Sequence, residues 1–284
     1  YRAYGGYEQP NPFGGFMSLN ALLAGGVWVG LLMAWWERGK WQWWRERWGR
    51  GLVVGTGVAV LLSVAVICSW SRGAWLGFAA GGGMILFFWP RRKLVGLGLV
   101  VSGVALVMGA YLAGVVPPAL TERVTSIARD FQVGDVRGVD INGANYAVLE
   151  RLAHWQAAFD MARDQPWLGV GFGNYEVAYE AYRLINWPAA LGHAHNYYFN
   201  LLAEGGVIGL GAYLLLWAFI VGKTIYLLLF LAWPERGIAL GLLGAWTTLS
   251  VHHLVDKLYV NNIYLHVAVM LALLVLLARR VEKR

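Results

Sequence analysis

The sequence has 284 residues, of which 58% are hydrophobic and 14% charged, with a mean hydropathy of +0.52. This composition excludes an ordinary soluble globular domain. The net charge of +7 does not indicate a nucleic-acid partner, because the basic residues lie in short connections between apolar runs, with no nucleic-acid-binding motif. The single cysteine, Cys68, excludes a disulfide framework and a thiolate metal site.

Seven apolar runs approach or exceed the length that a helix needs to cross a bilayer, about 20 residues. The 16 Trp and 14 Tyr residues fit a membrane protein, since their rings favour the water–lipid boundary. We therefore expect an all-α fold, a polytopic transmembrane helical bundle. The runs lie at residues 13–36, 51–68, 74–89, 94–116, 196–222, 238–255 and 263–278.

These runs predict three parts of the chain. Residues 1–116 hold spans 1–4, residues 117–195 form a long extracytoplasmic loop, and residues 196–284 hold spans 5–7. Because the chain begins with Tyr and has no signal-peptide pattern, we expect it to be a piece of a longer protein with further N-terminal spans.

The distribution of Lys and Arg predicts the orientation. Four alternate connections hold 14 of the 23 basic residues, whereas the long loop has six basic and nine acidic residues. By the positive-inside rule, those four connections are cytoplasmic and the long loop lies on the opposite side, together with the segment "HHLVDK" at residues 252–257. We interpret the charges of that segment as locally paired. The four basic connections are residues 37–50, 90–93, 223–236 and 279–284.

An amphipathic helix is predicted within the long loop. Five apolar residues recur at spacings of four and three, which places them on one helical face, and Pro166 ends the pattern. The next segment, "GVGFGNY", superficially resembles a dinucleotide-binding fingerprint, but no predicted strand precedes it. We favour a tight turn in close contact with its neighbours. The apolar face consists of Val148, Leu152, Trp155, Phe159 and Ala162.

The third run, at residues 74–89, is unusually rich in glycine at Gly77 and Gly81–Gly83. Such glycines allow helices to pack closely, or they form part of a groove that is open to a lipid chain. We favour close packing.

Ionisable residues gather at the outer ends of the predicted spans. Arg72, Arg151 and His195 all fall on the side of the long loop, where two guanidiniums near an imidazole suit a diphosphate. The alternative for Arg72 is a side chain that snorkels at the membrane boundary. His193 and His195 would suit a metal in a strand, but here they precede a helix, so we do not favour a metal site. Asn196 is placed to cap that helix.

Four segments carry a resemblance to a known family. The segment "YGGYEQPNPFGGFMSL" resembles the family's entry to a membrane span, and "SRGAWLGF" resembles its Ser-Arg-Gly-Ala element. The segment "RLAHWQAAFDMARDQPWLGVGFGNY" resembles the family pattern Arg-x-x-x-Trp followed by Pro-x-x-Gly-x-Gly. "HNYYFNLLAEGGVIG" fits a ligase pattern: His195, Asn196, nine residues, Gly206, two residues and Gly209. The chain thus resembles the C-terminal two-thirds of the O-antigen ligase and O-antigen polymerase superfamily of membrane glycosyltransferases.

This resemblance implies a metal-independent transferase without a cofactor, on the outer side of the bacterial inner membrane. It implies three partners: a glycan donor linked to undecaprenyl diphosphate, the membrane lipid around it, and a hydroxyl acceptor. The acceptor is lipid A core, a growing glycan or a protein. His195 is then the general base, and Arg72 and Arg151 stabilise the diphosphate. Second-tier substrate-binding candidates are Arg123, His193, Asn196, Tyr197 and Glu204.

Three alternatives remain open. The acceptor decides between a ligase, a polymerase that joins repeat units, and a protein O-oligosaccharyltransferase, because their chemistry is shared. A bicarbonate transporter is a further alternative, but a transporter should carry ionisable groups near the bilayer midplane. The cluster predicted here lies at the ends of the spans instead.

Overall fold

The computed structural model describes residues 2–38, 47–125, 135–143 and 145–283. Every regular element in these ranges is helical, which confirms the expected all-α bundle. The eight-residue stretch 39–46 of the first basic connection lies outside the described residues. The helices are η1 (Gly5–Tyr7), α1 (Pro10–Arg38), α2 (Arg47–Cys68), α3 (Arg72–Phe88), α4 (Lys93–Leu112), α5 (Pro118–Thr125), α7 (Tyr146–Asp164), α8 (Tyr175–Tyr182), α9 (Tyr197–Phe230), α10 (Glu235–His252) and α11 (Ile263–Glu282).

Each of the seven predicted spans is a helix, but their lengths differ from the expectation. Within the described ranges, five helices are long and apolar enough to cross a membrane: α1, α2, α4, α9 and α11. Helix α3 is also apolar but has 17 residues, and α10 is not among the five. Helix α9 is much longer than predicted and runs on to Phe230.

The chain divides into two compact units whose relative positions are not determined, so each is described separately. The bundle unit comprises residues 1–118, 220–252 and 258–284. The histidine unit comprises residues 119–219 and 253–257.

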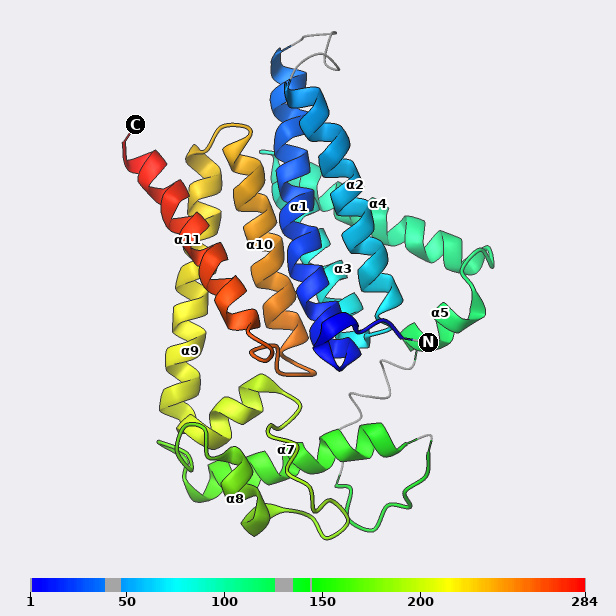
Figure 1. The fold of residues 1–284 in the computed structure, drawn as a ribbon, viewed down its shortest axis with the longest axis vertical. Coiled ribbons are helices and arrows are strands. Elements are labelled where there is room, and N and C mark those ends of the chain that lie inside the picture. Colours follow the sequence, from blue (N-terminus) through cyan, green and yellow to red (C-terminus); the bar gives the residue numbers. More distant parts are fainter. Residues whose placement is uncertain (1, 39–46, 126–134, 144, 284) are drawn as a thin grey trace. The chain divides into compact units, whose positions relative to one another are not determined.

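Helix α10 packs against both α1 and α3 in the bundle unit, and α1 lies between α10 and α2 in the view of Figure 1. Glycines let these backbones approach closely. A Cβ built on Gly26 would lie 2.2 Å from the backbone nitrogen of Gly241, and one on Gly81 would lie 2.4 Å from the carbonyl oxygen of Gly244. Close helix contact through small residues is a common way to pack membrane helices.

The glycines of α3 therefore serve packing, as favoured from the sequence. Gly77 and Gly81 both face α10, and the Thr248 hydroxyl donates a hydrogen bond to the Gly77 carbonyl (2.9 Å). Gly82 and Gly83, in contrast, have open space where a Cβ would be.

In the histidine unit, α7 is buried on more than the one face predicted from the sequence. Leu152, Trp155 and Ala162 of the expected stripe are buried, whereas Phe159 is 44% exposed. His154 and Ala158, on a different face, are 1% exposed each. The reason is that α8 and the turn before α9 cover this second face, in a cluster that contains Ala158, Tyr175, Tyr179 and Ala194.

Candidate active site

The two histidines before α9 are held in place by an asparagine cap. The Asn196 side-chain oxygen accepts hydrogen bonds from the backbone N–H groups of Tyr198 (3.0 Å) and Phe199 (3.1 Å), which confirms the predicted cap. Its amide donates to the Leu254 carbonyl (2.9 Å), and the Tyr197 N–H donates to the His253 carbonyl (2.9 Å). The cap therefore also fixes residues 253–257 beside the start of α9.

His195 has a backbone conformation that is uncommon for a residue with a side chain. Its φ angle is 51°, in the left-handed region, and strain of this kind persists where the surroundings enforce it, often at functional sites. The Nε2 atom is enclosed and has no hydrogen-bond partner. The His195 ring lies with its centroid 4.5 Å from that of His193 and 5.4 Å from that of His154. Three imidazoles, from α7 and from the turn before α9, thus meet at one point.

His193 is oriented by two contacts that determine where its proton lies. Its Nδ1 accepts a hydrogen bond from the backbone N–H of His195 (3.0 Å), so Nδ1 carries no hydrogen. In the neutral ring the proton is then on Nε2, which lies 3.9 Å from Oδ1 of Asp256. The same Oδ1 accepts a hydrogen bond from the Lys257 N–H (2.8 Å), which fixes the carboxylate. Asp256 thus contacts the backbone of its neighbour Lys257 and a residue 63 positions away.

His154 completes the cluster from the middle of α7. Its ring stacks on Tyr179 with centroids 4.6 Å apart, and its Nδ1 lies 3.0 Å from the Tyr175 hydroxyl. Burial is the main cause that lowers its pKa to about 4, and the neighbouring His193 adds to the effect. His154 is therefore neutral at physiological pH.

Burial also lowers the pKa of His195 and of His193. Arg151, one helical turn before His154 on α7, adds to both shifts through its positive charge, whereas the Asp256 carboxylate opposes them. Neutral imidazoles near the Arg151 guanidinium form a site that suits an anion and contains a potential proton acceptor.

His193, His195 and Asp256 bring one potential metal-ligand atom each to within 4.8 Å of one another. Three such ligands are the minimum for a transition-metal site. However, the His193 nitrogen that faces Asp256 bears the proton, and a metal ligand must be deprotonated. The charges of Arg151 and Lys257 also act on His193. These residues therefore fit an anion better than a metal ion.

A break in α9 connects the site to the rest of the histidine unit. Gly206 has φ 61° and ψ −164°, which interrupts the helix. The freed carbonyls of Ala203 and Glu204 accept hydrogen bonds from the Val170 (2.9 Å) and Gly171 (3.0 Å) N–H groups. In the opposite direction, the Val207 and Ile208 N–H groups donate to the Pro166 (2.8 Å) and Trp167 (3.3 Å) carbonyls. We call this contact, residues 166–171 with 203–208, the α9 joint.

The predicted tight turn begins in the α9 joint, and its backbone conformation explains why it contains three glycines. Gly169, Gly171 and Gly173 all have positive φ angles, and a Cβ on Gly169 would lie 2.3 Å from the Ala203 carbonyl oxygen. The Glu204 carboxylate accepts a hydrogen bond from the Tyr175 N–H (3.1 Å) at the start of α8. Glu204 is thus placed where an acidic group stabilises a helix N-terminus.

The remaining sequence-predicted residues are Arg72, which belongs to the bundle unit, and Arg123 and Tyr197 of the histidine unit. Arg72 is the first residue of α3 in the bundle unit, where Ser71 caps the helix through the Ala74 N–H (3.3 Å). Arg123 lies in the last turn of α5. Tyr197 is buried against Tyr213 and His253, with ring centroids 5.2 and 4.7 Å away. The role of Arg72 at the site rests on sequence alone.

Sequence reasoning did not select His154 or Asp256 as site residues. His154 follows Arg151 by three residues, so the two share a face of the predicted helix, and that spacing is the signal that could have identified it. Asp256 comes from a connection predicted to lie on the same side of the membrane as the long loop. Neither residue has a short-range spacing to His193 that a motif could reveal.

Acidification should destabilise the histidine unit. The folded-state pKa of His154 lies below the unfolded value of 6.5, so its contribution is present above pH 6.5 and is lost as pH falls toward 4. The shift corresponds to a loss of about 2 kcal/mol at pH 5. The thermal midpoint in nanodiscs, followed by tryptophan fluorescence, should fall between pH 7 and pH 5. A weaker pH dependence in His154→Gln is the control, and an unchanged midpoint in the wild type would contradict the assignment.

The helical bundle and the cluster of buried histidines beside an arginine define a multi-pass membrane protein with a candidate anion-binding, proton-accepting site. The sequence profile described as O-Antigen ligase matches residues 57–214, more than half of the chain. The chain therefore belongs to the O-antigen ligase family, whose members are glycosyltransferase-type membrane enzymes that act on lipid-linked glycans. The match includes the three clustered histidines, whereas Asp256 lies beyond it. No curated protein matches the chain.

Proposed function

We propose that this protein transfers a glycan from undecaprenyl diphosphate to a hydroxyl group of an acceptor, lipid A core in the ligase reaction. The reaction takes place on the outer side of the bacterial inner membrane. The observation that carries this proposal is the meeting of His154, His193 and His195 beside Arg151, in a chain of the O-antigen ligase family.

In the proposed reaction, His195 accepts the proton of the acceptor hydroxyl while that oxygen attacks the anomeric carbon of the donor sugar. The bond between the anomeric carbon and the phosphate oxygen breaks, and undecaprenyl diphosphate leaves with the bonding electrons. Direct displacement inverts the anomeric centre. Negative charge grows on the leaving diphosphate, so fixed cations there lower the barrier. Arg151 and Arg72 supply these charges, and no metal ion is required.

The electrostatics of the histidine cluster suggest an order of events. With its lowered pKa, His195 is neutral and therefore able to accept a proton, but it is a weak base. An anionic diphosphate bound at Arg151 offsets the guanidinium charge and raises the pKa of the nearby imidazole. The donor should therefore bind first and strengthen the base that activates the acceptor.

Asp256 and His193 act as positioning residues in this scheme. The carboxylate lies 3.9 Å from Nε2 of His193, and the Nδ1 atom of His193 accepts a hydrogen bond from the backbone N–H of His195. This chain of contacts keeps His195 in its left-handed conformation. Asp256 also raises the pKa of His195 and so makes it a stronger base.

Arg151→Lys should lower kcat by at least about tenfold, because lysine keeps the charge but not the two-pronged contact with phosphate oxygens. The effect should fall on kcat more than on KM, since the charge develops in the transition state. Steady-state rates with a purified lipid-linked donor measure both constants. Arg92→Lys, at the exposed start of α4, is the matched control. An unchanged kcat in Arg151→Lys would remove the arginine from its assigned role.

The function itself is tested with the purified protein in proteoliposomes that contain an undecaprenyl-diphosphate-linked glycan. Lipid A core, a glycan with a free end and an acceptor protein are offered in separate reactions. Transfer to lipid A core supports a ligase, transfer to the glycan a polymerase, and transfer to the protein an O-oligosaccharyltransferase. Bicarbonate uptake without transfer to any acceptor would overturn the proposal in favour of a transporter.

A further inference from the structure

The histidine unit contains a groove that is separate from the histidine cluster. It has a volume of about 760 Å³ and lies between the C-terminal end of α7, the segment after α8 and residues 136–138. Sites for small molecules commonly have volumes of about 300–1,000 Å³. The groove is therefore large enough for a ligand of several rings.

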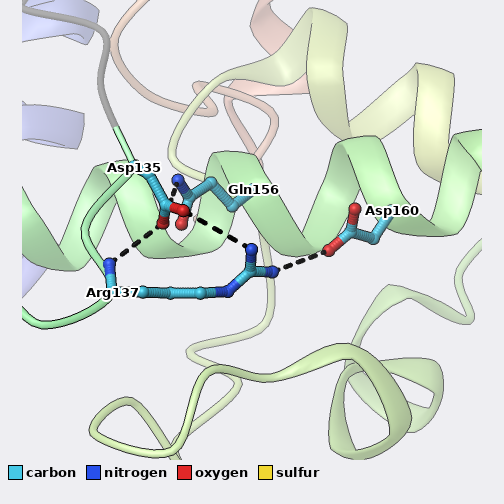
Figure 2. A network of polar contacts seen from close by, with 4 residues as sticks. All are labelled: Asp135, Arg137, Gln156 and Asp160. Atoms are coloured by element: carbon cyan, nitrogen blue, oxygen red, sulfur yellow. Dashed lines mark hydrogen bonds and ion pairs between the residues drawn. The ribbon is translucent and has the colours of Figure 1, made fainter.

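Charged groups of both signs line this groove, and Arg137 and Asp160 of the lining belong to a network with Asp135 and Gln156. Figure 2 shows Arg137 between two carboxylates, with its guanidinium 3.5 Å from Asp135 and 3.7 Å from Asp160. Asp135 also accepts hydrogen bonds from the Arg137 backbone N–H (3.0 Å) and from the Gln156 amide (3.2 Å). The network thus presents donors and acceptors side by side at the rim of the groove.

The aromatic residues of the groove lining are Tyr182 and Trp187. Trp187 is 5% exposed, and its ring lies 5.0 Å from that of Tyr146. The segment before it is anchored by the Tyr179 hydroxyl, which donates to the Trp187 carbonyl (3.0 Å). Tyr182 forms part of the wall and is hydrogen-bonded to Asp164. The partly exposed ring of Tyr182 beside guanidiniums and carboxylates suits a molecule with apolar ring faces and many hydroxyl groups.

This combination selects a sugar over other ligand classes. A phosphate group would be repelled by the carboxylates of Asp160 and Asp164, which lie among the guanidiniums of the lining. A lipid chain would favour walls without charges. Sugar hydroxyls are both donors and acceptors, so they can satisfy Arg137, Arg183 and Asp160 at the same time.

The groove lies away from the reacting bond. Arg151 and Asp160 are nine residues apart on α7, which places them on opposite faces and about 14 Å apart along the helix axis. A sugar in the groove is therefore several units away from the sugar whose bond breaks.

We propose that this groove is a distal oligosaccharide subsite, which binds sugar units of a long glycan far from the reacting end. This inference rests on the proposed transferase function and adds a length preference to it. Long glycans gain contacts in the groove, whereas a single repeat unit does not reach it.

The test compares lipid-linked donors that carry one repeat unit and several repeat units. The variants are Arg183→Ala and Asp160→Asn, with Glu180→Gln on the exposed part of α8 as the control. The wild type should have a lower KM for the long donor, and each groove variant should raise that KM about tenfold, the loss of one charge-assisted hydrogen bond. The KM for the short donor should stay the same. An equal effect on both donors, or no effect on either, would overturn the inference.

A second measurement separates this inference from the proposed function. Polysaccharide of the source strain, released from its lipid by mild acid, is titrated into the full protein in nanodiscs. If the wild type transfers no glycan but binds this polysaccharide, and Arg183→Ala loses the binding, the groove is confirmed while the transferase proposal fails. If the wild type does not bind it, the groove proposal fails, whatever the transfer assay shows.

Discussion

His195→Gln should abolish glycan transfer, with kcat lowered by a factor of about 10²–10⁴, the range typical for loss of a general base. Glutamine has a similar size and can still form hydrogen bonds, but it cannot accept a proton at neutral pH. The rate of transfer from a purified undecaprenyl-diphosphate donor is the measurement. His266→Gln is the control, because His266 lies in α11 of the bundle unit, with its ring against Phe16. Near-normal transfer by His195→Gln would end the case for this residue as the base.

Asp256→Asn distinguishes positioning from a purely structural role. The carboxylate raises the pKa of His195, so its loss should move the acidic limb of the profile of kcat/KM against pH to lower pH. The maximal rate should also fall, because the base is weaker. A lower rate with an unshifted limb would assign Asp256 to folding alone.

The sequence predicted the helices well because each of them is a continuous local feature. The apolar runs give the positions of α1 to α4 and α9 to α11, and the Asn196 cap follows from one residue type before one run. The ends of the helices were less accurate. Helix α9 extends beyond the prediction because apolar residues resume after Lys223 and Thr224, within the segment that the prediction assigned to a basic connection.

The histidine cluster could be predicted only in part. The family motif identified His195 and Arg151, but His193 and Asp256 meet across 63 positions through backbone contacts at Leu254 and His253. Sequence periodicity cannot predict a contact between residues so far apart in the chain. For the same reason, the second buried face of α7 was missed: it exists because α8 and the turn at Ala194 cover it.

Two motifs that looked independent in the sequence form one structure. The two sides of the α9 joint are the Pro166–Gly171 segment and the stretch around Gly206, the first glycine of the ligase pattern. Within a membrane-spanning helix, a break leaves backbone groups that water cannot satisfy, so another part of the chain must satisfy them. The joint does this with four backbone hydrogen bonds, two in each direction.

Gly206→Ala should therefore strongly disrupt the histidine unit. The φ and ψ angles of Gly206 are accessible almost only to glycine, and a Cβ there would lie 2.3 Å from the backbone carbon of Trp167. Neither the backbone angles nor the Trp167 backbone can adjust without loss of the joint. We expect a destabilisation of about 4 kcal/mol or more, seen as a lower thermal midpoint in nanodiscs, together with loss of transfer.

The neighbouring residue provides the matched control. Gly205 lies in the same helix, and a Cβ there would meet nothing within 4 Å. Gly205→Ala should leave the midpoint unchanged or raise it slightly, because alanine favours a helix over glycine by about 0.5–1 kcal/mol. If Gly205→Ala and Gly206→Ala behaved alike, the joint would not be what holds α9 to the segment after α7. The glycine of the ligase pattern would then need a different explanation, such as direct contact with the glycan.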